Sequence, residues 1–285
     1  MISFVGAGPG AADLITLRGA ARLAAADVVV WAGSLVPEAL LDHCRAGIEV
    51  HDSATMTLED VLAVFAARDE ATPIVRLHSG DPALYGAIGE QMDWCLAEQR
   101  SFEVVPGVSS LAAAAAALGR ELTVPGVSQS VVLTRLAGRT AASMPPGTRG
   151  ADGDPSTATA GEGVAAFAPH GATMAVFLSA ARPDELVAEL LAPGSGYGPD
   201  TPAAVVVRAS WPDETVVRTT VGRLAADLRA TGATMTALVL VGEALAGGPV
   251  RRRSHLYEPG YSTAYRLRSP AGSTQGRPSA RRTRP

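Results

Sequence analysis

A short polar loop, His78-Ser79-Gly80-Asp81-Pro82, follows an apolar run from Pro73 that is typical of a buried strand. Gly80 allows the backbone to approach a ligand or to take a positive φ, and Pro82 stiffens the turn. Asp81 offers only hydrogen-bond acceptors. The loop is therefore suited to recognise donors or a positive centre, or to hold a buried carboxylate. A plain Gly-Asp-Pro turn that caps the next helix is the alternative interpretation.

A glycine-rich loop, Val5-Gly6-Ala7-Gly8-Pro9-Gly10, ends the first apolar run and resembles a dinucleotide fingerprint. A nicotinamide or flavin site also needs an acidic residue at the end of the second strand, where it binds the ribose hydroxyls. Here that strand ends near Trp31, and the nearby acid, Asp27, stands at its beginning. A nucleotide-dependent oxidoreductase is therefore disfavoured, although it stays open as an alternative, and so does a simple tight turn.

The cationic side chains are all arginine or histidine, because the chain contains no lysine. This excludes Schiff-base chemistry and a P-loop lysine, so an anionic substrate must be held by arginine, histidine or backbone amides. No Ser-His-Asp order, paired carboxylate motif or metal-ligand cluster stands out, so no catalytic residue is assigned and no metal is expected. The candidates for substrate contacts, each with a structural interpretation beside it, are Arg76, Arg120, Arg135, Arg139, His51 and His78.

Alternating strands and helices must position these loops in the first half of the chain. The patterns predict strands at residues 2–5, 27–31, 47–51, 73–77 and 102–105. They predict helices at residues 14–25, 37–44, 57–68, 88–96 and 111–118. Such a βα repeat indicates a mostly parallel, doubly wound sheet, whose ligands bind at the carboxyl ends of the strands.

The second half differs in kind. Strands are expected at residues 130–135, 173–178, 203–207, 214–219 and 236–241, and helices at 183–191 and 221–230. The short connection at 209–213 favours a hairpin, so this sheet is expected to be mixed. We expect an N-terminal α/β domain over 1–118, a C-terminal α/β domain over 119–250 and an extension over 251–285. Composition predicts a flexible insertion at 141–164 and disorder from about residue 269.

Composition bounds the setting of the protein. With 285 residues and 47% hydrophobic content the chain can bury a large core, and it has neither a membrane-length apolar run nor a signal-like start, so a cytoplasmic protein without a membrane partner is expected. Cys44 and Cys95 are expected to be free thiols.

The net charge is divided unevenly along the chain. Residues 251–285 hold nine arginines and one glutamate, so this segment carries +8 and the rest carries −12. Few aromatics accompany these arginines, so nucleic acid is not the expected partner.

Three loops together carry a family resemblance. The two glycine loops described above and Val105-Pro106-Gly107-Val108-Ser109-Ser110 are similar to the N-domain motifs of the tetrapyrrole methylase family, the class III S-adenosylmethionine methyltransferases. The resemblance runs from Met1 to about Arg268. Within the family, the stretches at 52–58, 76–82, 122–129 and 254–261 are most similar to the branch that methylates carbon 11 of precorrin-4 or cobalt-precorrin-4 in cobalamin synthesis. The insertion after Arg139 and the long tail depart from the family pattern.

The resemblance implies two α/β domains with S-adenosyl-L-methionine in the cleft between them, S-adenosyl-L-homocysteine as product, a tetrapyrrole substrate and a homodimer. It implies cofactor contacts from Pro9, Ser79, Gly80, Asp81, Leu84, Ser109, Ser110, Leu178, Ser179 and Ala209. Methyl transfer to carbon requires alignment and exclusion of water more than a dedicated nucleophile. Methylation at another ring position, such as C17 or C20, and a non-catalytic tetrapyrrole carrier stay open.

Overall fold

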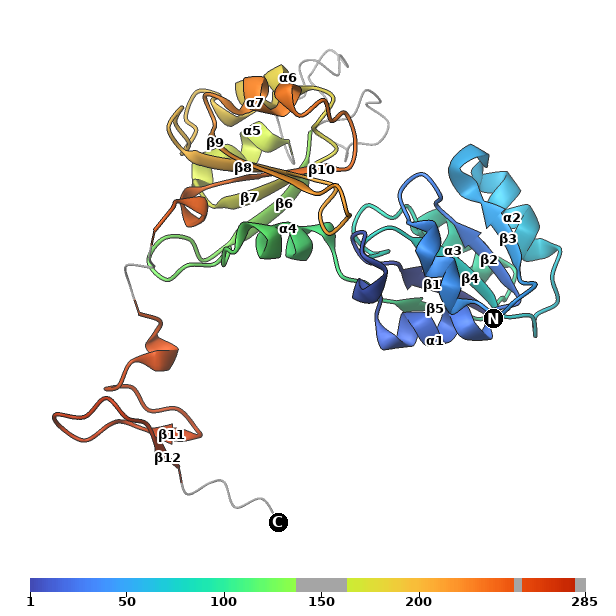
Figure 1. Cartoon of the computed structure of the whole chain (residues 1–285), viewed down its shortest axis with the longest axis horizontal. Helices are drawn as coiled ribbons and strands as arrows, with labels where there is room; N and C mark the ends of the chain where they lie inside the picture. The colour runs from blue at the N-terminus through green and yellow to red at the C-terminus, as the bar shows by residue number, and fades with distance from the viewer. Residues whose placement is uncertain (137–162, 249–252, 280–285) are drawn as a thin grey trace.

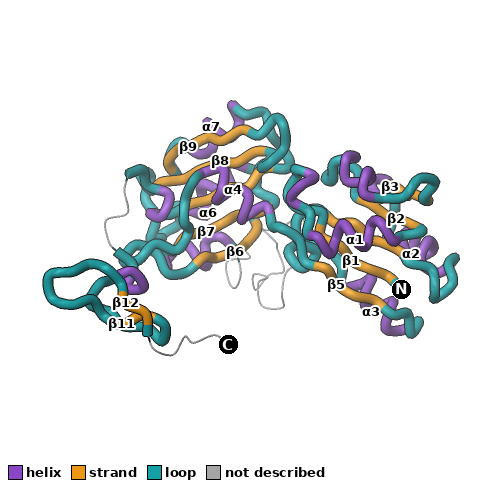
Figure 2. The backbone as a smooth tube through the Cα atoms, turned by 60° about the horizontal axis from the view of Figure 1, so that its bottom comes forward, coloured by secondary structure: helices purple, strands orange, loops and turns teal. Residues whose placement is uncertain are grey.

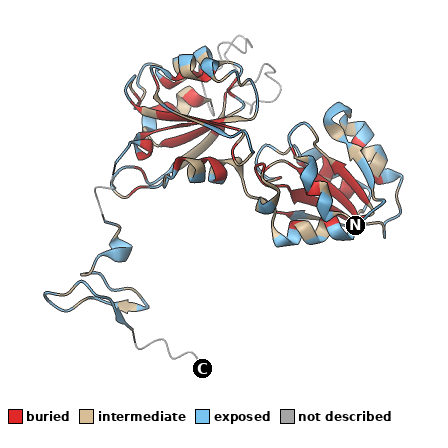
Figure 3. Cartoon of the chain, in the orientation of Figure 1, coloured by how far each residue is buried: buried red, intermediate tan, exposed pale blue. Residues whose placement is uncertain are grey.

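The computed structural model describes residues 1–136, 163–248 and 253–279. These residues form two α/β domains that lie side by side and a C-terminal extension that stands away from both (Figure 1). Buried residues gather on the two sheets, so each domain has its own core (Figure 3). Every strand that the sequence predicts is present, with ends shifted by at most two residues. None of the described helices is long and apolar enough to cross a bilayer.

The first sheet has five parallel strands in the order β3-β2-β4-β1-β5. Its strands are β1 (Ile2–Gly6), β2 (Val28–Trp31), β3 (Glu49–Asp52), β4 (Ile74–His78) and β5 (Phe102–Val105). The chain leaves β1 toward β2 and leaves β4 toward β5, so the loops after these two central strands diverge. The register pairs Gly6 with His78, which places both carboxyl ends side by side at the topological switch point.

Helices cover both faces of this sheet, as the βα pattern predicts. They are η1 (Ala12–Leu14), α1 (Leu17–Ala25), η2 (Glu38–His43), η3 (Ser53–Thr55), α2 (Leu58–Ala66) and α3 (Gly89–Ala97). Leu23 of α1 and Leu40 of η2 pack on one face, whereas Phe65 of α2 and Cys95 of α3 pack on the other. Thr57 caps α2 in a capping box with Asp60, which fixes where that helix begins.

The second sheet is mixed, in the order β6-β7-β10-β8-β9. Its strands are β6 (Val131–Arg135), β7 (Thr173–Phe177), β8 (Pro202–Val207), β9 (Thr215–Thr220) and β10 (Ala237–Val241). Strands β6 and β7 are parallel, and the other pairs are antiparallel, including the expected β8–β9 hairpin. Figure 2 shows this sheet and the first as two separate bodies.

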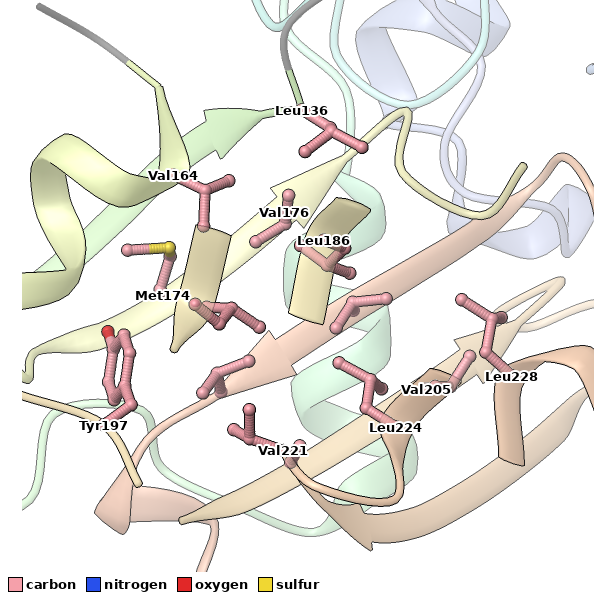
Figure 4. Close-up of a cluster of buried hydrophobic side chains, with 14 of the residues drawn as sticks. Leu136, Val164, Met174, Val176, Leu186, Tyr197, Val205, Val221, Leu224 and Leu228 are labelled. Carbon is pink, nitrogen blue, oxygen red and sulfur yellow. The ribbon is translucent and has the colours of Figure 1, made fainter. Parts of the chain in front are cut away.

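Apolar side chains fill both faces of the second sheet. One face packs against α5 (Val164–Phe167), α6 (Pro183–Leu190) and α7 (Leu224–Ala230), where Leu186, Leu224 and Leu228 meet Met174 and Val205 (Figure 4). The opposite face packs against α4 (Ser110–Leu118), through alanines and Leu118. The short helices η6 (Ala168–His170) and η7 (Glu243–Leu245) flank the strands.

The position of α4 bears on the domain boundary. We expected the first domain to run through residue 118, but α4 belongs by packing to the core of the second sheet. The reason is its composition: an alanine-rich helix can lie close to the small residues Ala175 and Ala204 of that sheet. On packing, we place the division between β5 and α4, at residues 106–109.

Two segments bear on the expectations of disorder. The insertion expected at 141–164 lies outside the described residues except for its last two, where Val164 begins α5 and is fully buried. Residues 269–279, expected to be disordered, instead belong to an arm with η8 (His255–Tyr257), β11 (Arg266–Leu267) and β12 (Arg277–Pro278). The Arg277 guanidinium donates to the Arg268 carbonyl within this arm, a side-chain to main-chain contact that composition does not report.

Candidate functional site

Three glycine loops meet at the carboxyl edge of the first sheet. The amide of Ala7 donates to the His78 carbonyl at 2.7 Å, and the amide of Gly80 donates to the Gly8 carbonyl at 2.8 Å. A Cβ on Gly6 would lie 2.5 Å from the Gly107 Cα atom, and one on Gly107 would lie 2.1 Å from the Gly80 carbonyl oxygen. Side chains cannot fit there, so the loops pack backbone against backbone.

The Asp81 carboxylate ties these loops together. Its Oδ1 atom accepts the amide of Ala83 at 2.8 Å, and its Oδ2 atom accepts the amide of Gly107 at 2.9 Å. Gly80 has a φ of 64°, which glycine adopts without strain. Asp81 therefore shapes the loop by accepting hydrogen bonds from main-chain donors after both β4 and β5.

The segment after Pro82 carries the wall across to the second domain. A Cβ on Gly86 would lie 2.2 Å from the Pro82 carbonyl oxygen, so this turn is closed tightly. Tyr85 and Ala87, on either side of Gly86, have positive φ values of 58° and 50°. The Tyr85 ring packs on Phe177 of β7, with ring centroids 5.0 Å apart. An aromatic pair thus joins the loop after β4 to the end of a strand in the second domain.

The first turn of α4 supplies the third loop's side chains. The Ser109 hydroxyl accepts the amide of Leu111 at 3.2 Å and so caps the helix. Ser110 begins the helix beside it, and both serines line a cavity between the domains. The backbone of both serines lies next to Gly80: a Cβ atom built on Gly80 would be 3.8 Å from the Ser110 amide nitrogen and 3.9 Å from the Ser109 Cα atom.

The opposite wall belongs to the second domain and includes the turn between β8 and β9. The indole N–H of Trp211 donates to the Pro9 carbonyl at 3.0 Å. The amide of Ala11 donates to the Ser210 hydroxyl at 2.9 Å. These bonds join the first glycine loop to a turn about two hundred residues further along the chain.

A cavity of about 360 Å³ lies between the two walls, within the range of small-molecule sites. Nine of the ten residues that the sequence analysis assigned to a cofactor line it: Pro9, Ser79, Gly80, Asp81, Leu84, Ser109, Ser110, Leu178 and Ala209. Ser179 does not, because its side chain is fully buried and its hydroxyl donates to the Val176 carbonyl. Residues that the sequence reasoning missed include Leu35, Tyr85, Phe177, Arg208, Trp211 and Met235.

Backbone strain concentrates around this cavity. Among the described residues, seven other than glycine have positive φ values, and these cavity-lining ones are among them: Tyr85, Leu178, Arg208 and Thr236. Leu178 is also 64% exposed despite its apolar side chain. Such conformations cost about 1–3 kcal/mol each and persist where the surroundings enforce them, which is typical of ligand sites.

The proposed substrate contacts fall elsewhere. Arg76 and His78 lie on the buried face of β4, outside the cavity lining, and the Arg76 guanidinium donates to the Val30 carbonyl at 3.3 Å. Burial lowers the pKa of Arg76 to about 10. Burial, with the Arg76 charge adding to it, lowers the pKa of His78 to about 3, so this imidazole is neutral at physiological pH. Within the described part of the chain, Arg76 Nε and His78 Nε2 are buried without a hydrogen-bond partner.

The other cations are also separated. Arg120 lines a different cavity together with Arg218, and its guanidinium donates to the Gly248 carbonyl. His51 lies 2.6 Å from the carboxylate of Glu49. Arg135 ends β6 in register with Phe177, which lines the cavity, although Arg135 itself is not part of the lining. Arg139 lies outside the described residues.

The fold and the site define a two-domain α/β protein with a cavity of small-molecule size at the carboxyl edge of its parallel sheet. A family model for tetrapyrrole (corrin/porphyrin) methylases matches residues 1–225. The chain belongs to this family. It is 46% identical over 246 residues to the precorrin-4 C(11)-methyltransferase of Rhodococcus erythropolis, covering 86% of this chain and 92% of that protein.

Two solved structures extend the comparison. A cobalt precorrin-4 methyltransferase is 41% identical, with a TM-score of 0.76, over 86% of this chain and 96% of that chain. A uroporphyrin-III C-methyl transferase from Thermus thermophilus, in complex with S-adenosyl homocysteine, is 28% identical, with a TM-score of 0.64, over 86% of this chain and 92% of that chain.

Proposed function

We propose that this protein transfers a methyl group from S-adenosyl-L-methionine to carbon 11 of precorrin-4 or cobalt-precorrin-4 in cobalamin biosynthesis. The observation that carries the proposal is the 46% identity to a precorrin-4 C(11)-methyltransferase, because it covers 86% of this chain and 92% of that protein. The similar solved structure is a cobalt precorrin-4 enzyme, so both forms of the substrate are candidates.

The residues of the cleft fit the cofactor. S-adenosyl homocysteine is bound in the Thermus thermophilus relative. In this chain, Ser79 and the hydroxyls of Ser109 and Ser110, which line the cavity, offer hydrogen-bonding partners for the amino and ribose groups. The apolar side chains of Leu84, Leu178 and Met235 offer surface for an adenine ring. These three side chains are partly or largely exposed and would gain burial from a bound ligand.

The proposed mechanism rests on positioning. When bound, the cofactor supplies an electrophilic methyl carbon on a sulfonium. The residues of this chain hold the reactants in line and keep water out, through the loop braced by Asp81 on one side and the Tyr85–Phe177 pair across the gap. We assign no general base. Arg135, in register with the cavity-lining Phe177, is our candidate for a carboxylate of the tetrapyrrole, since guanidinium groups pair with carboxylates in bidentate fashion.

Titration calorimetry with S-adenosyl-L-homocysteine tests the cofactor assignment. We expect micromolar or tighter binding, and its absence at those concentrations would overturn the proposal. Incubation with precorrin-4 or cobalt-precorrin-4 and methyl-labelled cofactor, followed by NMR of the product, tests the ring position. A label on C17 or C20 would keep the cofactor site and reject the C11 assignment. Binding of both ligands without turnover would favour a carrier.

We further infer a homodimer and a cytoplasmic location. The dimer is supported by the arm at residues 253–279, on which Leu256, Tyr257 and Tyr265 are each more than half exposed. Apolar and aromatic side chains exposed together are typical of contact surfaces. Light scattering on the purified protein should give a mass twice that of the 29.1 kDa chain, and a monomer at all concentrations would reject the dimer.

A further inference from the structure

The turn between β8 and β9, residues 208–214, is hydrogen-bonded to the first glycine loop across the domain boundary. Trp211 donates its indole N–H to the Pro9 carbonyl at 3.0 Å. Ser210 accepts the amide of Ala11 at 2.9 Å. The two bonds fall on either side of Gly10, so the turn fixes both the position and the direction of the loop after β1.

Gly10 makes this contact possible. A Cβ atom built there would lie 2.2 Å from Cδ1 and 2.4 Å from Nε1 of Trp211. Both distances are far inside van der Waals contact, so the indole ring lies directly on the glycine backbone. The third glycine of this loop is therefore explained by a tryptophan of the other domain.

The turn itself is held in a strained shape by its own charged groups. Arg208 and Ser210 have positive φ values of 51° and 67°. The Arg208 guanidinium lies 4.0 Å from the centroid of the Trp211 ring and donates to the Asp213 carboxylate at 2.6 Å. The Glu214 carboxylate accepts the amide of Ser210 at 2.6 Å. These contacts hold the indole in one orientation, as expected where strain serves a site.

The same residues line the cavity. Pro9 forms part of one wall, whereas Arg208, Ala209 and Trp211 form part of the other. We propose that Trp211 is a positioning residue for the cofactor: its contact with Pro9 and Gly10 sets the separation of the two walls at this end of the cleft. This inference rests on the proposed function, because it assumes that the cleft holds S-adenosyl-L-methionine.

A double-mutant cycle on Gly10 and Trp211 tests the contact. We expect Trp211→Ala to weaken S-adenosyl-L-homocysteine binding about tenfold in titration calorimetry, the scale of losing one hydrogen bond together with packing. Gly10→Ala should weaken it comparably, because the new methyl group displaces the ring. In the Trp211→Ala background, Gly10→Ala should add less than twofold, because the ring is gone. Losses that multiply in the double variant would contradict the inference.

Trp211→Phe, which keeps an aromatic ring but removes the indole N–H donor, covers the case in which the alanine variant fails to fold. We expect a rise in Kd of about fivefold with an unchanged midpoint of thermal unfolding. Trp94→Phe is the matched control, because Trp94 packs on Phe65 in the first domain. It should leave Kd unchanged. If the wild type binds the ligand and Trp211→Phe binds equally well, the inference fails and the proposed function stands; if the wild type does not bind, the proposed function fails first.

Tryptophan fluorescence distinguishes a residue at the ligand from a purely structural one, because the emission of a tryptophan far from the ligand should not change on binding. In the Trp31→Phe/Trp94→Phe protein, Trp211 is the one tryptophan left of the three in the chain. Its emission should change on titration with S-adenosyl-L-homocysteine, with the same Kd as calorimetry. Emission that stays constant while calorimetry reports binding would reject a position for Trp211 at the ligand.

Discussion

Asp81 and Gly107 are joined by a hydrogen bond of 2.9 Å, from the glycine amide to the aspartate Oδ2 atom, that links the loop after β4 to the loop after β5. Asp81→Ala removes this acceptor and the one for Ala83. We expect the fold to survive and the affinity for S-adenosyl-L-homocysteine to fall about tenfold or more, since a bond to a charged acceptor contributes about 1.5–3 kcal/mol.

Asp81→Asn should give an intermediate affinity, because the amide oxygen can still accept one of the two bonds. Asp93→Ala is the control, because Asp93 is an exposed carboxylate on α3 away from the cleft. Calorimetry on the three variants checks the order, and an Asp81→Ala protein with wild-type affinity would refute a role for this carboxylate in the site.

The contact between glycine backbones predicts a large difference between two glycine variants. Gly107→Ala places a methyl group 2.1 Å from the Gly80 carbonyl oxygen. We expect it to lower the free energy of unfolding by about 2–4 kcal/mol, as overpacking against backbone does. Gly89→Ala adds a methyl group with no heavy atom within 4 Å, at the start of α3, and should be neutral or slightly stabilising. Denaturant unfolding measures both, and equal stabilities would contradict the packing.

His78 predicts a pH dependence of stability. Its pKa is about 3 in the folded protein, below the ordinary histidine value of 6.5, because burial disfavours the charged form. Between these two values the unfolded chain binds a proton that the folded chain does not. The contribution of the neutral His78 imidazole to the free energy of unfolding is therefore fully present above about pH 6.5. It is lost as the pH falls toward 3, with a slope of at most about 1.4 kcal/mol per pH unit.

His78→Phe should remove that contribution, since Phe packs against Phe4 in the place of the imidazole. The quantity to measure is the difference in free energy of unfolding between wild type and variant across pH 4–8. This difference should be constant above pH 7 and shift in favour of the variant below pH 6. A difference that stays constant throughout would mean that His78 titrates normally.

Two substitutions at Leu178 should have different effects on stability but the same effect on ligand binding. This residue lies exposed in the cavity wall with a φ of 52°, a conformation that favours glycine. We expect Leu178→Gly to be about 1 kcal/mol more stable than Leu178→Ala, because glycine relieves the strain, whereas both lose contact with the ligand. Unfolding curves and calorimetry together check this. A glycine variant less stable than the alanine variant would show that the backbone there is unstrained.

The sequence predicted the strands and the loops at their ends because both depend on local patterns: apolar runs give the strands, and the glycines at 6–10 and 80 mark turns that only one kind of residue tolerates. The cavity wall that the first domain supplies could therefore be predicted from these strands and glycine loops. Trp211 and Phe177 were missed because their roles arise from how the two domains dock, which no local spacing reports.

The arginines and histidines were harder to place. Arg76 stands two residues before His78 and close to the loop in sequence, which suggested a substrate contact. Strand alternation instead puts both side chains on the buried face of the sheet, toward α2 and α3. Arg120 follows α4 away from the cleft, and it lines another cavity together with Arg218, a residue of the β8–β9 hairpin. Positions of this kind are set by tertiary packing.

The position of α4 changes how opening and closing of this molecule should be understood. Over the described residues, the backbone passes from the first sheet to the second once, at residues 106–109, and Ser109 there also lines the cavity. The joint of the molecule therefore lies inside its ligand site. A rotation of one domain about this joint would also move Ser109 and Ser110, so the angle between the domains and the position of these two hydroxyl groups in the cavity would change together.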